Sequence, residues 1–350
     1  MILILLTLLI LSCVGLRRTD NHDMCLKKDH TDVIKGIFII IVIYSHMVPY
    51  MTTAGVEFSP ILDVPSNRLI YRMGQLMVVM FLFYSGYGVM ESISIKGDPY
   101  VKAIPVKRVL STLINYVIAV GVFLAMNKLL GIHYTIKQYL LSLVAWESVG
   151  QSNWYIFAIL CCYVSTFISF TLFTKREHAF CFNAFLLLIY IIVLYKFKEG
   201  WWYNTIPAYL AGMLVSINKR YIFYILDHFY ILCIVVLTCS FVLCFHLRYI
   251  VLWHLIMSVV FAFLVYVLTD RFVIESRILR WCGKNLFQLY IYQRLPMIAL
   301  PTLFPQIVRL YPYIYVSCCL VITIVMAALI PPISINKKTY SRWKIPRYQS

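Results

Sequence analysis

The sequence predicts an all-α membrane protein, a polytopic helix bundle with about ten transmembrane helices. Of its 350 residues, 62% are apolar or aromatic and only 13% are charged, and the mean hydropathy is +0.83. A soluble domain is about half apolar and a quarter charged, so this composition excludes a single water-soluble core, a disordered chain and a small disulfide-stapled module. The apolar content recurs along the whole chain, which favours one integral membrane domain over two or three soluble domains.

The predicted spans are charge-poor windows close to the length that a membrane helix needs, about 20 residues for a hydrocarbon core roughly 30 Å thick. They are 36–56, 73–90, 109–127, 154–174, 179–195, 200–218, 228–247, 249–269, 285–308 and 310–336. Because the apolar runs are continuous rather than alternating, helices are favoured over the strands of a barrel. One window, the ninth, carries a charge in its interior, Arg294.

The net charge of +17 follows from 31 Lys and Arg residues against 14 Asp and Glu residues. In a membrane protein this excess indicates cytoplasmic loops and contacts with anionic lipid, so the lipid bilayer is an expected partner. The basic residues gather in alternate connections, which places Lys35 and the C-terminus on the cytoplasmic side. No basic run lies outside a short loop or tail, so nucleic acid is not an expected partner.

The pattern divides the chain into three parts. Residues 1–27 form an apolar N-terminal segment with a cytoplasmic leader, residues 28–336 form the membrane domain, and residues 337–350 form a basic cytoplasmic tail. Two interpretations of the first part stay open, an extra span or a mis-assigned start with Met24 as the first residue. The eleven cysteines lie mostly in apolar runs without a CxxC pair, so free buried thiols are expected and a metal site is not.

Ionisable groups inside a span are costly and are therefore functional candidates. His46 follows Lys35 by eleven residues, which places it about 16 Å further along the same helix and on the same face. A neutral imidazole near mid-membrane can take a proton from a hydroxyl group, and a cation near the interface can hold a phosphate or a carboxylate. The alternative is a packed histidine that is bonded to a neighbouring helix.

Two further segments carry polar or small residues within predicted spans. Gly86 and Gly88 would allow close helix contact or local unwinding, and Ser85 and Tyr87 supply hydroxyl groups beside them. A charged Arg294 about a third of the way across the membrane should face a polar cavity or bind an anion.

Five features in this order resemble the acyltransferase-3 family of polytopic membrane acyltransferases. Two of them are Asp32-x-x-Lys35-Gly36 followed by His46, and Phe83-x-Ser85-Gly86-Tyr87. The others are Lys107-Arg108 before the third span, Trp154-Tyr155-Ile156 at the start of the fourth, and Trp281-x-Gly283-Lys284-Asn285-x-Phe287-x-Leu289-Tyr290-Ile291-Tyr292 at the ninth. The resemblance covers about residues 28–335.

The resemblance implies transfer of an acyl group, usually acetyl, from cytoplasmic acyl-CoA to a hydroxyl group of a surface polysaccharide or glycolipid. The implied partners are acyl-CoA as donor substrate, with acetyl-CoA the first choice, and a carbohydrate or glycolipid acceptor; no bound cofactor is implied. His46 would be the catalytic histidine, in a multi-pass protein of the bacterial cytoplasmic (inner) membrane. The expected substrate-binding residues are Lys35, Ser85, Tyr87, Lys107, Arg108, Trp154 and Arg294.

Three positions depart from the family pattern. Lys35 replaces the usual Arg of its motif, which keeps the charge but loses the bidentate geometry of a guanidinium. Ser111 stands where many members have a second loop Arg, and Gln293 stands where many have His.

The expected mechanism is general-base catalysis, in which His46 takes the proton of the acceptor hydroxyl while the thioester is attacked directly. Tyr87, Ser85 or Arg294 would stabilise the oxyanion. Glu147 either orients the acceptor or is a solvated loop carboxylate. Two other functions stay open, a proton-coupled secondary transporter that uses the intramembrane His and Arg, and a non-catalytic partner of polysaccharide machinery.

Overall fold

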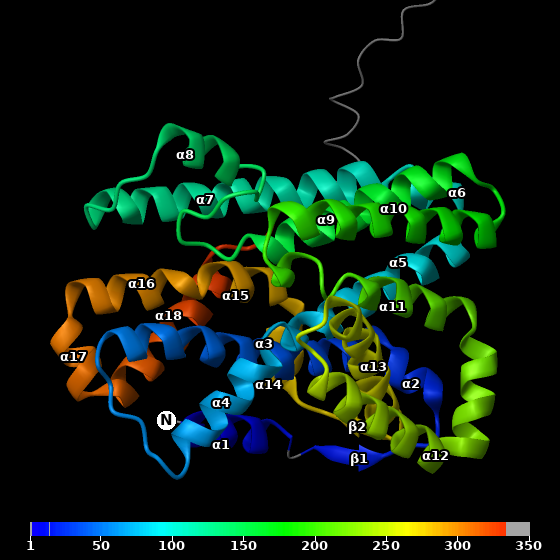
Figure 1. Ribbon diagram of the computed structural model, residues 1–350, viewed down its shortest axis with the longest axis horizontal. Helices are drawn as coiled ribbons and strands as arrows, with labels where there is room; N and C mark the ends of the chain where they lie inside the picture. The colour runs from blue at the N-terminus through cyan, green and yellow to red at the C-terminus, as the bar shows by residue number, and fades with distance from the viewer. Residues whose placement is uncertain (1, 14, 334–350) are drawn as a thin grey trace, which may run out of the picture.

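The computed structural model describes residues 2–13 and 15–333 and is almost entirely helical (Figure 1). Within these ranges, eight helical segments are long and apolar enough to cross a membrane. They are Lys28–Thr53, Asp63–Lys96, Asp98–Leu129, Trp154–Leu172, Arg176–Phe197, Lys219–His246, Val251–Asp270 and Pro312–Leu329. The predicted class, a polytopic membrane helix bundle, is therefore confirmed. The prediction of about ten spans compares with eight such segments in the described residues.

Six of these segments are single helices, one of them the central α3 (Lys28–Thr53), and two are compound. The other single ones are α9 (Trp154–Leu172), α10 (Arg176–Phe197), α12 (Lys219–His246), α13 (Val251–Asp270) and α18 (Pro312–Leu329). The first compound segment joins α4 (Asp63–Met73), η1 (Gly74–Val78) and α5 (Val79–Lys96). The second joins α6 (Asp98–Val101), η2 (Pro105–Leu110) and α7 (Ser111–Leu129).

The other two predicted spans, 200–218 and 285–308, are broken into short helices. The first contains η3 (Gly200–Trp202) and α11 (Pro207–Ile217). The second follows α14 (Arg277–Lys284) and consists of α15 (Leu286–Tyr292), α16 (Arg294–Leu303) and α17 (Pro305–Leu310). Proline lacks a backbone N–H and favours the first turn of a helix, so Pro207 and Pro305 start new helices where hydropathy predicts continuous ones.

Two glycine-mediated crossings hold the centre of the bundle together. Helix α3 crosses α14 so closely that a Cβ on Gly36 would overlap the Leu279 carbonyl, and one on Gly283 would overlap the Asp32 carbonyl. Two of the sequence features that resemble the family therefore meet backbone to backbone.

Helices α5 and α11 make the second crossing, because a Cβ on Gly86 would overlap the Tyr209 carbonyl and one on Gly212 would overlap the Phe83 carbonyl. The predicted close contact is thus confirmed at Gly86. It is wrong at Gly88, since no described atom lies within 4 Å of a Cβ built there and α5 continues past it without unwinding.

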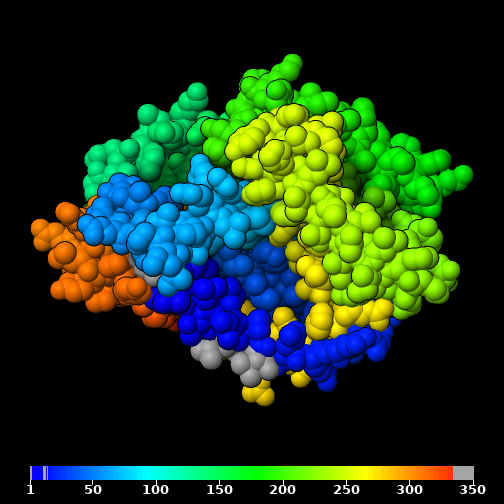
Figure 2. Space-filling model, turned by 60° about the horizontal axis from the view of Figure 1, so that its bottom comes forward, coloured from blue at the N-terminus to red at the C-terminus, as the bar shows by residue number. Residues whose placement is uncertain are grey.

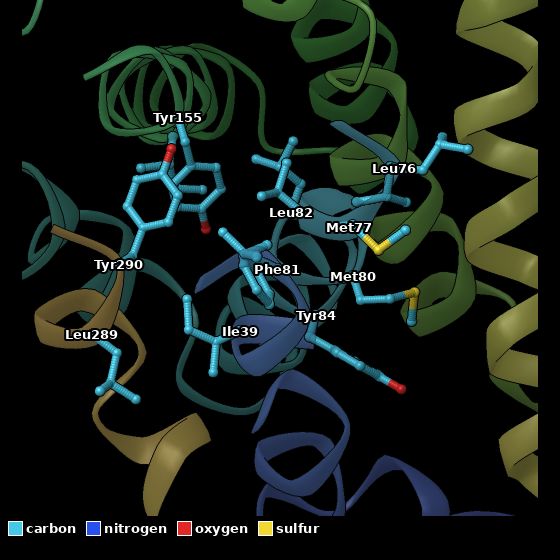
Figure 3. Close-up of a cluster of buried hydrophobic side chains, with 14 of the residues drawn as sticks. Ile39, Leu76, Met77, Met80, Phe81, Leu82, Tyr84, Tyr155, Leu289 and Tyr290 are labelled. Carbon is cyan, nitrogen blue, oxygen red and sulfur yellow. The ribbon is translucent and has the colours of Figure 1, made fainter. Parts of the chain in front are cut away.

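The bundle is layered around α3 and α5. Helices α7, α9 and α10 lie together on one side of α3, α15 and α16, and α8 (Ile136–Ser142) lies outside them (Figure 1). At the centre, Phe81 and Leu82 of α5 pack among side chains of α3, α9 and α15, including Ile39, Tyr155 and Leu289 (Figure 3).

The N-terminal segment packs against this body. It comprises α1 (Ile2–Ser12), which is too short to be one of the eight spans, β1 (Leu16–Arg18) and α2 (His22–Leu26). Strand β1 pairs antiparallel with β2 (Phe272–Ile274), between α13 and α14. Figure 2 shows the segment in dark blue along the lower edge, beside the yellow residues around β2. The predicted basic tail, residues 337–350, lies outside the described residues.

Candidate active site

His46 lies on α3 and faces the junction between α15 and α16. Its partly buried imidazole interacts with the Gln293 side chain and with the Arg294 guanidinium. Among the described residues, no hydrogen-bond partner reaches His46 Nδ1. The structure thus brings together two residues predicted from sequence, His46 and Arg294, and leaves Nδ1 of the imidazole buried without a hydrogen-bond partner in the described ranges.

Gln293 positions this junction. It is fully buried, and its Nε2 donates a hydrogen bond to the Tyr290 carbonyl at 2.8 Å. Because Gln293 keeps helical backbone angles, the chain turns from α15 into α16 without unwinding. Tyr290 and Arg294 are therefore one helical turn apart and lie on the same face.

The chain between α8 and α9 folds into the bundle instead of remaining a solvated loop. Ala145 and Gly150 adopt positive φ angles of 60° and 117°, which reverse the chain direction. Gln151 is fully buried, and its Nε2 donates a hydrogen bond to the Tyr116 hydroxyl at 2.8 Å. Irregular backbone is tolerated inside a helix bundle where protein surrounds it, and here it places Ser152 and the start of α9 beside Tyr290.

The hydroxyl groups of Ser152 and Tyr290 meet beside the first turn of α9. Tyr290 interacts with the Ser152 side chain, the Tyr155 backbone N–H and the Arg294 charge. Ser152 and Tyr290 are 3% and 1% exposed. Sequence reasoning included Tyr290 in a motif without assigning it a role, and it missed Ser152, Gln151 and Tyr116 because the loop appeared solvated.

The other predicted substrate-binding residues lie on an earlier part of α3, on α5, on η2 and at the start of α9. The Lys35 ammonium is 2.6 Å from the Asp32 carboxylate. Ser85 and Tyr87 lie on α5, and the electrostatic partners of Tyr87 are the carboxylates of Glu91 and Asp23.

A second group of predicted residues lies around η2. Arg108 is partly buried, donates a hydrogen bond from Nε to the Tyr100 hydroxyl at 3.2 Å, and lies over the Tyr163 ring at 5.8 Å. Lys107 beside it is exposed. Trp154 is the first residue of α9 and packs at the edge of the Tyr155 ring.

Glu147 belongs to a cation–aromatic cluster rather than to the His46 site. It pairs with Lys198 at 3.6 Å, and the Lys198 ammonium lies over the rings of Trp146 and Trp202 at 4.3 and 4.5 Å. In the part of the chain that the structure describes, no group of three His, Cys, Asp or Glu side chains could hold a metal ion.

The described residues contain eight helical segments that are long and apolar enough to cross a membrane, which indicates an integral, multi-pass membrane protein. The acyltransferase-3 family, described as an acyltransferase domain, matches residues 30–330. Because this match spans most of the 350 residues, the chain belongs to the acyltransferase-3 family and is a membrane acyltransferase. No curated protein and no solved structure matches it.

Proposed function

We propose that this protein moves an acyl group, acetyl in the first instance, from acyl-CoA to a hydroxyl group of a cell-surface polysaccharide or glycolipid sugar. The observation that carries the proposal is the buried Nδ1 of His46, which has no hydrogen-bond partner among the described residues, inside a bundle of this family. A nitrogen that lacks a protein partner can take a proton from a bound alcohol. We place the enzyme in a bacterial cytoplasmic membrane with its C-terminus in the cytoplasm.

The reaction is a direct transfer in this scheme. His46 accepts the proton of the acceptor hydroxyl while its oxygen attacks the thioester carbonyl and forms a tetrahedral intermediate. The carbon–sulfur bond then breaks, the CoA thiolate takes the proton from the imidazolium, and an ester and free CoA are released.

The donor is expected at the end of the bundle that carries the basic η2 segment. Lys107 is exposed there and Arg108 lies among tyrosine rings, so both charges are close to the surface that would meet the CoA phosphates. Lys35 forms an ion pair with Asp32, so we expect it to bind a phosphate more weakly than the sequence alone indicates.

The test uses membrane vesicles that contain the protein, with the cytoplasmic face outward, and acetyl-labelled acetyl-CoA. We expect alkali-labile label in the carbohydrate fraction and an equal amount of free CoA. His46→Ala should lower this rate by about 10²–10⁴-fold, because it removes the general base. His178→Ala is the matched control, since that imidazole is exposed at the start of α10.

Two results would overturn the proposal. One is wild-type protein that transfers no label although it is folded and abundant. The other is His46→Ala with the wild-type rate. Proton-coupled solute uptake by liposomes without any acyl-CoA would instead favour the transporter.

A further inference from the structure

The first turn of α9 lies inside the bundle and is not capped. Tyr155 and Ile156 are 7% and 1% exposed, although they belong to the start of a 19-residue helix. Asn153 occupies the N-cap position without accepting a hydrogen bond from the helix, and its Nδ2 donates instead to the Ala145 carbonyl at 3.0 Å. The first N–H groups of a helix have no acceptor within it and carry partial positive charge, so this turn presents donors to the interior.

Two buried hydroxyl groups, those of Tyr290 and Ser152, lie close together beside the first turn of α9. Tyr290 Oη lies next to the Tyr155 N–H and the Ser152 hydroxyl. The centres of the Tyr290 and Tyr155 rings are 5.2 Å apart, and the two rings lie next to each other in Figure 3. Neither Tyr290 Oη nor Ser152 Oγ has a partner within hydrogen-bond geometry in the described ranges. A buried polar group without a partner is destabilising, and a ligand at this point would supply the missing partner.

Arg294 lies near both this group of donors and His46, the proposed base. It lies one turn beyond Tyr290 on the same helical face, and its charge acts on both the Tyr290 hydroxyl and the His46 imidazole. Its Nε is buried and has no acceptor among the described atoms. Hydroxyl, amide and guanidinium donors therefore gather next to the residue that takes the proton.

We infer that Tyr290, the Tyr155 amide and Arg294 form the oxyanion site of the transfer reaction. The inference rests on the proposed function. When the acceptor oxygen bonds to the thioester carbon, the carbonyl electron pair moves onto oxygen, and these donors bind that negative charge. The electron pair then re-forms the carbonyl double bond as the carbon–sulfur bond breaks, and the negative charge leaves on the CoA thiolate. Preorganised donors of this kind act on the transition state more than on the bound substrate.

The sequence offers three candidates for stabilising the oxyanion, Tyr87, Ser85 and Arg294. Arg294 belongs to the site, whereas Tyr87 interacts with carboxylates at another part of α5. A hydroxyl whose neighbours are carboxylates is poorly placed to bind an oxyanion, because like charges repel.

The experiment compares Tyr290→Phe with Tyr292→Phe in the vesicle assay with acetyl-CoA. Each change removes one hydroxyl from the same short helix, and both side chains are buried, but Tyr292 is not part of the proposed site. We expect Tyr290→Phe to lower kcat by about 10²-fold, with an unchanged KM for acetyl-CoA, and Tyr292→Phe to leave both constants at the wild-type values.

The outcomes separate this inference from the function on which it rests. A wild-type protein without transfer activity contradicts the function. An active wild type with an equally active Tyr290→Phe contradicts the oxyanion site alone, and so does a raised KM with unchanged kcat, because that result means ground-state binding. If Tyr290→Phe fails to fold, Arg294→Lys tests the same site; it keeps the charge but loses the Nε donor, and wild-type kcat would overturn the inference.

Discussion

Lys35 and Asp32 form an ion pair one helical turn apart on α3, with the ammonium 2.6 Å from the carboxylate. The Asp32 side chain is almost fully buried beneath the crossing of α3 and α14, and its second oxygen lacks a hydrogen-bond partner in the described structure. Lys35 therefore supplies the charge that compensates a buried carboxylate. The motif Asp32-x-x-Lys35-Gly36 is at least partly a structural unit, in which the glycine permits the crossing and the lysine neutralises the acid.

Lys35→Met should destabilise the protein, because it leaves the Asp32 carboxylate buried without its counter-ion. Breaking a buried pair on one side typically costs about 3–5 kcal/mol, whereas replacing both partners costs much less. We expect a lower thermal unfolding temperature in detergent for the single variant and recovery in Asp32→Asn/Lys35→Met. Equal unfolding temperatures for wild type and Lys35→Met would show that the pair contributes nothing.

Gly86→Ala should lower the unfolding temperature while Gly88→Ala should not. A methyl group at Gly86 would overlap the Tyr209 carbonyl and force α5 away from α11, and overpacking of this kind costs about 1–3 kcal/mol or more. At Gly88 the space is open, and alanine favours a helix by about 1 kcal/mol over glycine. The crossing is misassigned if the two variants unfold at the same temperature.

His22→Ala should release the N-terminal segment from α12 and α13. The imidazole Nδ1 lies 2.7 Å from Asp270 and Nε2 lies 2.9 Å from Asp227, so one ring joins the segment to both helices. Its loss leaves the fully buried Asp270 without this partner. Limited trypsin digestion should then cleave faster around Arg18 than in wild type.

The matched control for this experiment is His228→Ala, an exposed histidine next to Asp227 on α12. Unchanged digestion of both variants would mean that strand pairing between β1 and β2 holds the segment without His22.

Cys25 should resist alkylation in the folded protein. Burial, together with the Asp270 carboxylate, raises the pKa of its thiol to about 12, and Sγ donates a hydrogen bond to the Asp270 carbonyl at 2.8 Å. At pH 8 only about one thiol in 10⁴ is ionised, and the thiolate is the reactive form. Mass spectrometry after maleimide treatment in detergent should find label on the exposed Cys181 and none on Cys25 until the protein is denatured. Equal labelling of both would contradict this burial.

Local composition predicts most of the helices because the bilayer selects apolar runs of a particular length. Eight such segments lie in the described part of the chain, and each of the two predicted spans that break contains a proline that starts a new helix, Pro207 or Pro305. His46 and Arg294 were predicted for the same physical reason, since a charge or an imidazole inside an apolar run needs a function or a partner.

Hydropathy and charge along the chain are therefore enough to predict the membrane class, most of the helices and the polar residues within them. Which of these residues meet depends on how the helices pack. Arg294 lies close to His46, and Lys35 forms an ion pair with Asp32. The loop between α8 and α9 is buried in the bundle, which places Ser152 and the first amides of α9 next to Tyr290. Hydropathy depends on neighbours along the chain, whereas these contacts depend on which helix faces pack together, and glycine crossings and buried backbone turns set that packing.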